Sequence, residues 1–163
     1  MPQEVPVPYL RNLDKLVQTD SAKFTIRGHV HHLGYDDQTF TIEWRDEEDS
    51  LKSWNAPIGF TARVKCNGFA TIWIQCKEIG NPMTLMLINK FEGIRKGKDF
   101  EVVFDVSAQT IQVLVNGQPL GDFRRIAQSP TTQYLGVTGD GLALFRPDVK
   151  VCQDADVAKR FVN

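Results

Sequence analysis

One stretch of the sequence, residues 99–146, restricts the fold more than any other. Apolar side chains occupy every second position of Phe100–Val106, which is the period of a strand with one buried face. A second alternating run, Ile111–Val115, follows directly and ends at Asn116–Gly117, a dipeptide that accepts the positive φ angles of a two-residue hairpin turn. The spacing in this stretch therefore predicts antiparallel strands and no helix.

The same two-residue period recurs along most of the chain, with turn-forming residues between the runs. Further strands are expected at residues 23–30, 39–44, 60–65, 71–76, 85–88, 120–123, 134–137 and 142–145. With the less regular segments near the amino terminus, the pattern predicts about ten to twelve short strands, which is typical of an all-β sandwich. We therefore expect a two-sheet antiparallel jelly roll.

Near the carboxyl terminus the pattern changes. Asp154 is a suitable helix cap, and apolar residues follow at helical spacing as far as Phe161, so a short helix is expected over residues 154–161. A chain of 163 residues fits one domain with its own core. We expect a single β-sandwich domain over residues 1–150 and a C-terminal appendage over residues 151–163.

Charge and cysteine content narrow the setting in which the protein works. A formal net charge of −1 provides no general attraction for phosphate backbones, so we expect no nucleic-acid partner. Three cysteines are too few and too odd in number for a disulfide framework, which favours a reducing compartment. The amino terminus has no signal-peptide pattern, and no stretch approaches the roughly 20 apolar residues of a membrane span. We expect a cytoplasmic protein, with any export by a route that needs no signal peptide.

Residue patterns that carry catalysis or metal binding are weak. The chain has no nucleophile elbow, phosphate loop or zinc-binding helix. Glu43, Asp46 and Glu78 would act as glycosidase carboxylates only if two of them lay about 5–10 Å apart across a bond. The histidines of residues 29–32 lack a fixed set of four zinc ligands, so a solvated strand end is expected there. We expect no enzyme activity, no cofactor and no metal site.

A modest group of basic residues surrounds the alternating runs. It consists of Arg95, Lys96, Lys98, Arg124 and Arg125. We expect these side chains to solubilise loops and sheet edges, which β-sandwich proteins need in order to resist edge-to-edge pairing. Contact with an acidic partner surface is the alternative.

The carboxyl-terminal half of this pattern is similar to that of a known family. In order along the chain it has Val113–Gly117, then Phe123–Ile126, then Leu135–Val137, and then Gly139–Asp140. These segments resemble, in residue type and in order, the carboxyl-terminal half of galectins. The amino-terminal half is similar more weakly, above all at Thr25–Val30. The resemblance implies a jelly-roll sandwich of two antiparallel sheets.

The galectin resemblance covers roughly residues 6–146 and implies binding rather than catalysis. In galectins the sugar site is built on an H-x-N-x-R strand, a V-x-N strand and a W-G-x-E-x-R segment. The first motif falls on residues 63–67 and the second on residues 73–75. The ligand-binding residues that the resemblance implies are Arg63, Lys65, Asn67, Trp73 and Gln75.

The third galectin motif is the part from which this chain departs. It falls near residues 79–84, where Gly80 is kept and Ile79 stands in place of the tryptophan. In such a site a flat aromatic ring stacks on the apolar face of galactose, and an acid and an arginine orient one another and the sugar hydroxyls. Because Ile79, Met83 and Thr84 cannot do this, the departure speaks against ordinary β-galactoside binding. It leaves an altered, non-lactose specificity or weak carbohydrate binding, and it favours a protein-interaction domain over simple lactose recognition.

The orientation of Trp73 depends on the turn at Asn67–Gly68, and two registers stay open. A two-residue turn places Trp73 opposite Ala62, on the core face of the strand pair. A three-residue turn pairs Trp73 with Arg63, where its ring is a stacking platform for a ligand. Turn propensity favours the first register, and the galectin resemblance favours the second.

Two functional hypotheses follow from the sequence. The first is a galectin-like binding module for a glycan or glycoconjugate, with an altered, non-lactose specificity. The second is a galectin-fold domain that has lost sugar binding and binds a protein partner through a sheet face, an edge strand or the appendage. A homodimer is compatible with both hypotheses.

Overall fold

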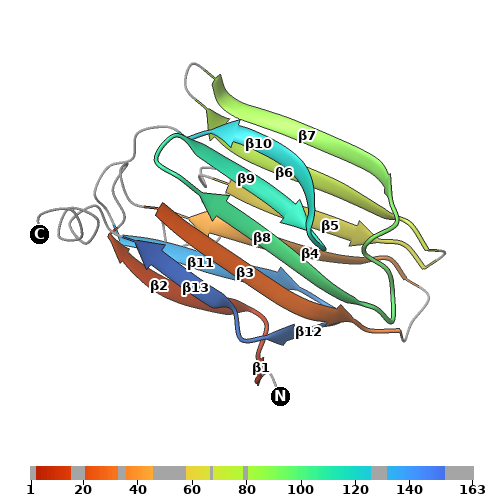
Figure 1. The fold of residues 1–163 in the computed structure, drawn as a ribbon. Helices are drawn as coiled ribbons and strands as arrows, with labels where there is room; N and C mark the ends of the chain where they lie inside the picture. Colours follow the sequence, from red (N-terminus) through yellow and green to blue (C-terminus); the bar gives the residue numbers. More distant parts are fainter. Residues whose placement is uncertain are drawn as a thin grey trace, which may run out of the picture.

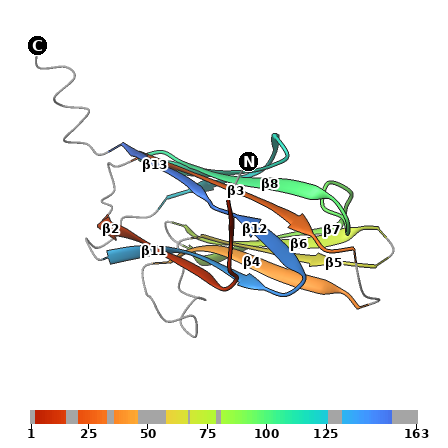
Figure 2. The ribbon, with the colours of Figure 1, turned by 90° about the horizontal axis from the view of Figure 1, so that it is seen from below.

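The chain forms two antiparallel β-sheets that lie face to face (Figures 1 and 2). The computed structural model describes residues 3–15, 21–32, 36–45, 58–66, 68–78, 81–125 and 132–152. Within these residues there are thirteen strands and no helix. The all-β jelly-roll sandwich expected from the sequence is confirmed.

The first sheet has seven strands. Their order is β1 (Glu4–Val5), β12 (Leu142–Phe145), β3 (Ser21–Val30), β8 (Asp99–Val106), β9 (Thr110–Val115) and β10 (Gln118–Arg124). The seventh strand, β13 (Asp148–Cys152), also pairs with β3. Because β12 and β13 pair with opposite ends of β3, one long strand has two short neighbours on the same side.

The second sheet has six strands and ends at β7. Their order is β2 (Tyr9–Lys15), β11 (Thr132–Gly139), β4 (Gln38–Arg45), β5 (Ile58–Val64), β6 (Ala70–Glu78) and β7 (Asn81–Phe91). Every strand expected from the sequence coincides with or overlaps a strand of one of the two sheets. The segment expected at residues 85–88 is longer than its pattern indicates, since β7 runs through Pro82. Proline is tolerated there because an edge strand leaves one side of its backbone unpaired.

The hairpin between β9 and β10 forms as its sequence predicts. Asn116 and Gly117 have φ angles of 50° and 81°. Both values lie in the left-handed region that a two-residue hairpin of this type requires. Val115 is therefore followed by a turn that returns the chain directly along β9.

Alternate side chains of the two sheets point toward each other and form the core. The largest fully buried side chains are Trp44, Phe24, Phe40, Phe60, Phe104, Ile26, Ile42, Ile58, Ile72, Ile74 and Ile94. These residues lie mostly at every second position of their strands, because successive side chains of a strand point to opposite faces. Burying them from both sheets at once stabilises the sandwich.

Trp44, near the end of β4, joins the two sheets within this core. Its ring centroid lies 5.8 Å from that of Phe24, which belongs to the opposite sheet. Its indole N–H donates a hydrogen bond of 2.7 Å to the side-chain oxygen of Gln133 on β11. The only polar atom of this large side chain is thereby paired, which lets Trp44 be buried completely.

Arg125 is not one of the solubilising surface residues that the sequence pattern predicts. Its side chain is buried, with its guanidinium carbon 5.3 Å from the centroid of the Trp44 ring. The guanidinium also donates a 3.0 Å hydrogen bond to the backbone oxygen of Ser107. The expectation of a solvated role was wrong for Arg125, because a cation over a tryptophan face is stabilised without full hydration.

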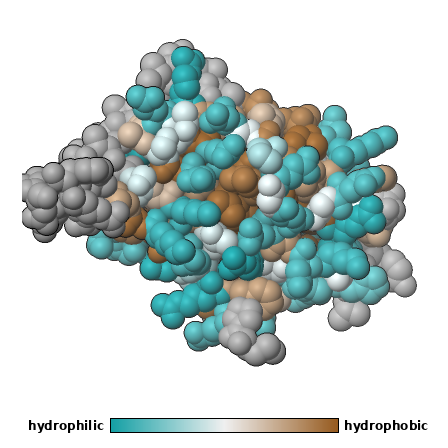
Figure 3. Space-filling view, viewed as in Figure 1, coloured by the Kyte–Doolittle hydropathy of each residue, from teal (hydrophilic) through white to brown (hydrophobic). Residues whose placement is uncertain are grey.

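The outer face of the seven-stranded sheet is mainly hydrophilic around a small apolar area (Figure 3). Arg27 and Glu101 form an ion pair of 2.8 Å on this face. Close by, Nδ1 of His29 lies 2.7 Å from a carboxylate oxygen of Asp99. The charges of Arg27 and Glu101 on this face are thus already matched with one another.

The first and last strands of the described part, β1 and β13, both belong to the seven-stranded sheet. β1 pairs with β12, and β13 runs to Cys152, two residues beyond the expected domain boundary at residue 150. The helix expected over residues 154–161 lies outside the described residues. In the described part, no helix is long and apolar enough to span a bilayer.

The two tryptophans of the second sheet give a matched test of this packing. We expect Trp44→Phe to lower the free energy of unfolding by about 2–3 kcal/mol, because it leaves the Gln133 oxygen buried without its donor and shrinks the core. Trp73→Phe removes the same atoms from the outer face and is expected to cost less than about 1 kcal/mol. Urea unfolding of both variants measures the difference. Equal losses would contradict the assignment of Trp44 to the core and Trp73 to the surface.

Candidate functional site

The outer face of β4, β5, β6 and β7 carries its side chains in three rows that run across the strands. The first row contains Glu43, Gly59, Gln75 and Leu85. The second row contains Thr41, Thr61, Trp73 and Leu87. The third row contains Thr39, Arg63, Thr71 and Asn89. The sheet register therefore places three of the predicted ligand residues, one from each row, on one face.

Trp73 lies in the middle row and is partly exposed. Its partners across the sheet are Thr61 and Leu87, so neither register considered from the sequence is correct. The connection between β5 and β6 spans the five residues 65–69, since Val64 pairs with Ala70. The observed register still turns Trp73 to the face of Arg63, as the three-residue turn would have done, because the two registers differ by an even number of residues.

The connection is held by its own backbone hydrogen bonds. The N–H of Lys65 donates to the carbonyl oxygen of Phe69 at 3.2 Å, and the N–H of Gly68 donates to the carbonyl oxygen of Lys65 at 3.4 Å. Gly68 has a φ of 116°, a conformation that side-chain-bearing residues rarely adopt. The glycine therefore permits the wider turn that sets the strand register.

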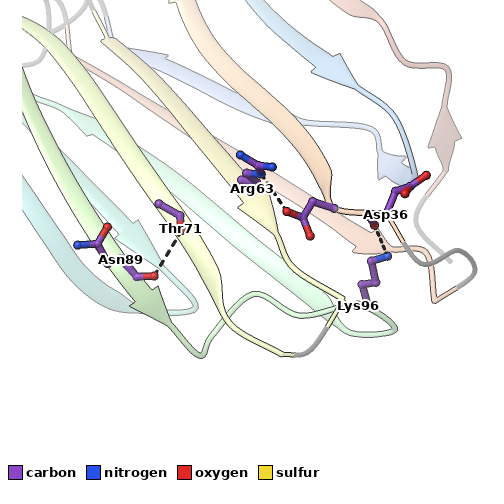
Figure 4. Close-up of polar contacts among 6 residues, drawn as sticks. Asp36, Arg63, Thr71, Asn89 and Lys96 are labelled. Carbon is purple, nitrogen blue, oxygen red and sulfur yellow. Dashed lines mark hydrogen bonds and ion pairs between the residues drawn. The ribbon is translucent and has the colours of Figure 1, made fainter.

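Arg63 and Gln75 are both exposed, one on each side of the Trp73 row. The Nε of Arg63 lies 3.0 Å from a carboxylate oxygen of Asp37, in an ion pair that holds the guanidinium in place (Figure 4). The two side chains are 54% and 30% exposed, so the pair contributes little to stability and its remaining N–H groups face solvent. Such groups are suited to bind hydroxyl or anionic oxygens of a ligand.

The remaining predicted ligand residues lie in the connection after β5. Lys65 is exposed, and its side chain borders a hollow of about 470 Å³ at the end of the third row. Asn67 lies outside the described residues. The other residues that line this hollow are Phe69, Thr71, Asn89 and Lys90.

The apolar side of the site comes from β7. Leu85 and Leu87 are 55% and 49% exposed, and they stand next to Gln75 and Trp73. The sequence pattern does not single them out, because residues 85–88 form a continuous apolar run with no alternation to show which face is solvated. Only pairing with β6 decides that Leu85 and Leu87 point outward. Phe69 and Lys90 were missed for a similar reason, since each becomes a neighbour of the site only through the register.

A buried ion pair lies on the same face, at the end of β4. The Nε of Arg45 is 3.0 Å from a carboxylate oxygen of Glu43, and their side chains are only 5% and 11% exposed. The guanidinium packs over Gly136, where an added Cβ would lie 2.8 Å from it. Glu43 is one of the three carboxylates that the sequence offers for glycosidase chemistry. It is thus already paired with an arginine. Asp46 and the side chain of Glu78 lie outside the described part.

The histidines expected at a solvated strand end are found there. β3 ends at Val30, and His31 and His32 are exposed. Within the described residues, no group of three or more histidine, cysteine or acidic side chains is placed to hold a metal ion. The candidate site consists of Arg63, Trp73 and Gln75, which the sheet register places on one face.

The two arginine–carboxylate pairs on this face should respond differently to mutation. We expect Arg45→Met to lower the free energy of unfolding by about 3 kcal/mol, because it leaves the Glu43 carboxylate buried without its partner. Arg63→Ala is expected to cost less than about 1 kcal/mol, because its pair is exposed. Urea unfolding of both variants tests this, and adding Glu43→Leu to Arg45→Met should restore part of the loss. If Arg45→Met left the free energy of unfolding unchanged, the buried pair would not be needed for stability.

Comparison with known proteins shows that this fold is similar to those of solved galectin structures. No protein-family model matches the chain, and no curated protein sequence matches it. The structure of sheep galectin-11 in complex with glycerol aligns with a TM-score of 0.65 and 19% identity, covering 90% of this chain and 99% of that one. A human galectin-16 variant, R55N, aligns with a TM-score of 0.62 and 16% identity, covering 91% and 98%. Galectin-Ib of Xenopus laevis aligns with a TM-score of 0.60 and 22% identity, covering 88% and 100%. At these identities the likeness establishes the fold.

Proposed function

We propose that this galectin-like domain is a binding module that holds a carbohydrate other than lactose on the outer face of β5, β6 and β7. The observation that carries the proposal is the partly exposed ring of Trp73, flanked along β6 by Thr71 and Gln75. Sugar rings have an apolar face that packs on aromatic rings and a rim of hydroxyls that needs hydrogen-bond partners. Trp73 offers the first, and its polar neighbours offer the second.

The polar partners surround Trp73 in a way that suits this task. Gln75 supplies both an amide donor and a carbonyl acceptor in the first row. In the third row, Arg63 is kept in position by Asp37 while its outward N–H groups stay available. Thr61, directly opposite Trp73, has a hydroxyl that lies 3.1 Å from the hydroxyl of Thr41, so the hydroxyl beside the ring is held in a hydrogen bond.

A specificity other than lactose agrees with the apolar character of β7. The third galectin motif is replaced at Ile79, Met83 and Thr84 in the sequence, and the described part of β7 presents Leu85 and Leu87 beside Trp73 and Gln75. Two leucines cannot orient sugar hydroxyls, but they can pack against apolar edges such as methyl groups. We therefore place the hydrogen-bonding half of the ligand toward β5 and its apolar half toward β7.

A glycan array with matched variants tests the proposal. We expect the wild-type chain to bind a defined set of oligosaccharides, with free lactose competing poorly. Trp73→Ala, Arg63→Ala and Gln75→Ala should each weaken that binding about tenfold or more, which corresponds to about 1.4 kcal/mol for each lost contact. The matched controls are Arg27→Ala, whose ion pair on the opposite sheet has similar length and exposure, and Gln112→Ala on β9.

Two results would count against carbohydrate binding on this face. One is an array on which no oligosaccharide binds the wild-type chain. The other is a signal that falls as much in the Arg27→Ala control as in Arg63→Ala. Thermal unfolding of each variant should accompany the array, because the exposed positions are not expected to alter stability by more than about 1 kcal/mol.

A second candidate function, binding of a protein, is favoured by one specific observation. Leu85 and Leu87 are the most exposed large apolar side chains of the described residues, and they lie together on β7, the last strand of its sheet. An exposed apolar edge strand is a typical place for another strand to pair. If β7 paired antiparallel with β7 of a second copy, with Met86 opposite Met86, Leu85 and Leu87 of each copy would lie together. The two Lys90 side chains would stay apart.

Sedimentation of the purified chain tests the second candidate. Under that candidate the wild-type chain is a dimer, and Leu85→Ser combined with Leu87→Ser makes it a monomer, because the apolar contact across the edge is lost. Val151→Ser, at another exposed apolar residue, is the control and should leave the dimer intact. A wild-type chain that sediments as a monomer at every concentration would exclude self-association through β7.

The proposed compartment is the cytoplasm, with export by a route that needs no signal peptide. The three cysteines are free thiols, and Cys66 is exposed. Free thiols of this kind persist in reducing surroundings, whereas oxidising compartments favour their pairing. Binding of glycoconjugates outside the cell would follow such export.

A further inference from the structure

The hollow at the end of the third row has an unusual charge. Its lining includes two lysines, Lys65 and Lys90, and no acidic residue. Two other hollows on the molecule combine basic and acidic side chains: one has Lys23 and Lys150 with Asp105, and the other has Arg27 with Asp99 and Glu101. In a chain whose formal net charge is −1, a purely cationic lining is a local feature and not a consequence of overall composition.

The two ammonium groups of the hollow, those of Lys65 and Lys90, have no ion-pair partner within the part of the chain that the structure describes. The nearby cation Arg63, by contrast, already has Asp37 as a partner at 3.0 Å. A ligand that brings a negative group would therefore meet its unpaired countercharge at the lysines.

The remaining lining residues suit a sugar and not a bare ion. Phe69 is 38% exposed and gives the hollow an aromatic surface. Thr71 is nearly buried, and its hydroxyl donates to the backbone oxygen of Asn89 at 3.3 Å, which ties β6 to β7 beneath the hollow (Figure 4). The volume of about 470 Å³ lies within the range of small-molecule sites, roughly 300–1,000 Å³, and exceeds what a single small anion needs.

The hollow is also continuous with the proposed carbohydrate site. Thr71 lies two residues before Trp73 on the same face of β6 and directly opposite Arg63 on β5. A sugar unit stacked on Trp73 therefore has its neighbouring unit over Thr71, at the mouth of the hollow. The distance between alternate residues of one strand, about 7 Å, is comparable to the length of one sugar unit.

From these features we infer that the domain prefers acidic glycans, in which the unit next to the sugar on Trp73 carries a sulfate or a carboxylate that binds between Lys65 and Lys90. This inference rests on the proposed carbohydrate-binding function. Lysine ammonium groups act as compact point charges and do not impose the planar geometry of a guanidinium, so both kinds of anion are accommodated. Phe69 packs against the apolar face of the acidic unit.

An array of glycan triplets tests the inference. Each triplet contains a neutral oligosaccharide, its sulfated form and its sialylated form, so that the two sources of negative charge are separated. We expect the wild-type chain to bind at least one acidic member about tenfold more tightly than its neutral counterpart. Raising the ionic strength from about 0.1 M to 1 M should reduce this ratio, because exposed ion pairs are screened by salt.

Variants locate the preference on the molecule. Lys65→Gln combined with Lys90→Gln should bring the ratio of acidic to neutral binding close to one. Lys23→Gln combined with Lys150→Gln removes the same charge from the seven-stranded sheet and should leave the ratio unchanged. All four lysines are exposed, so the variants should remain folded, which thermal unfolding checks.

The outcomes separate this inference from the function on which it rests. Equal binding of neutral and acidic members by the wild-type chain would overturn the acidic preference and leave carbohydrate binding intact. An equal fall of the ratio in both double variants would also overturn it, since it would show a general response to charge. No binding to any triplet would overturn the carbohydrate function, and the acidic preference with it.

Discussion

The burial of two sheet faces against each other is the constraint on which the rest of the structure depends. Every strand must send one set of alternate side chains into the shared core, and a register slip of one residue would send the wrong set there. Trp44 is where this requirement is most demanding, because its ring meets Phe24 of the opposite sheet while its N–H needs Gln133. The guanidinium of Arg125, which directly follows β10, packs over the same Trp44 ring.

Because the inner faces are committed to the core, function is left to the outer faces and the edges. The seven-stranded sheet shows paired charges on its outer face, such as Arg27 with Glu101. The six-stranded sheet instead shows an aromatic ring, Trp73, between polar and apolar neighbours. Next to it are two lysines that form no ion pair with any carboxylate of the described residues. A ligand can pack against the exposed ring and form ion pairs with the lysines. The outer face of the six-stranded sheet is therefore the better candidate for binding.

The fold was largely predictable, and the site only in part. Alternation at residues 100–106 and 111–115, with the Asn116–Gly117 turn, specified local strand pairing, and the structure follows it. The site depends on how separate strands are aligned, and the observed pairing of Trp73 with Thr61 differs from both registers considered from the sequence. Leu85 and Leu87 were not separable from their inward neighbours, because a continuous apolar run has no period.

By itself, the sequence determined that this chain is an all-β sandwich, because a period of two with turn residues between the runs is local information that each strand carries alone. The galectin resemblance implied that Arg63 and Gln75 share a site, but the sequence left open whether they lie on one face, because a two-residue turn at Asn67–Gly68 would have put them on opposite faces. Only the tertiary structure decided that Trp73 faces outward between them, and that Lys90 from β7 stands beside Lys65. Those facts depend on cross-strand register, which packing of the whole core fixes and no single segment contains.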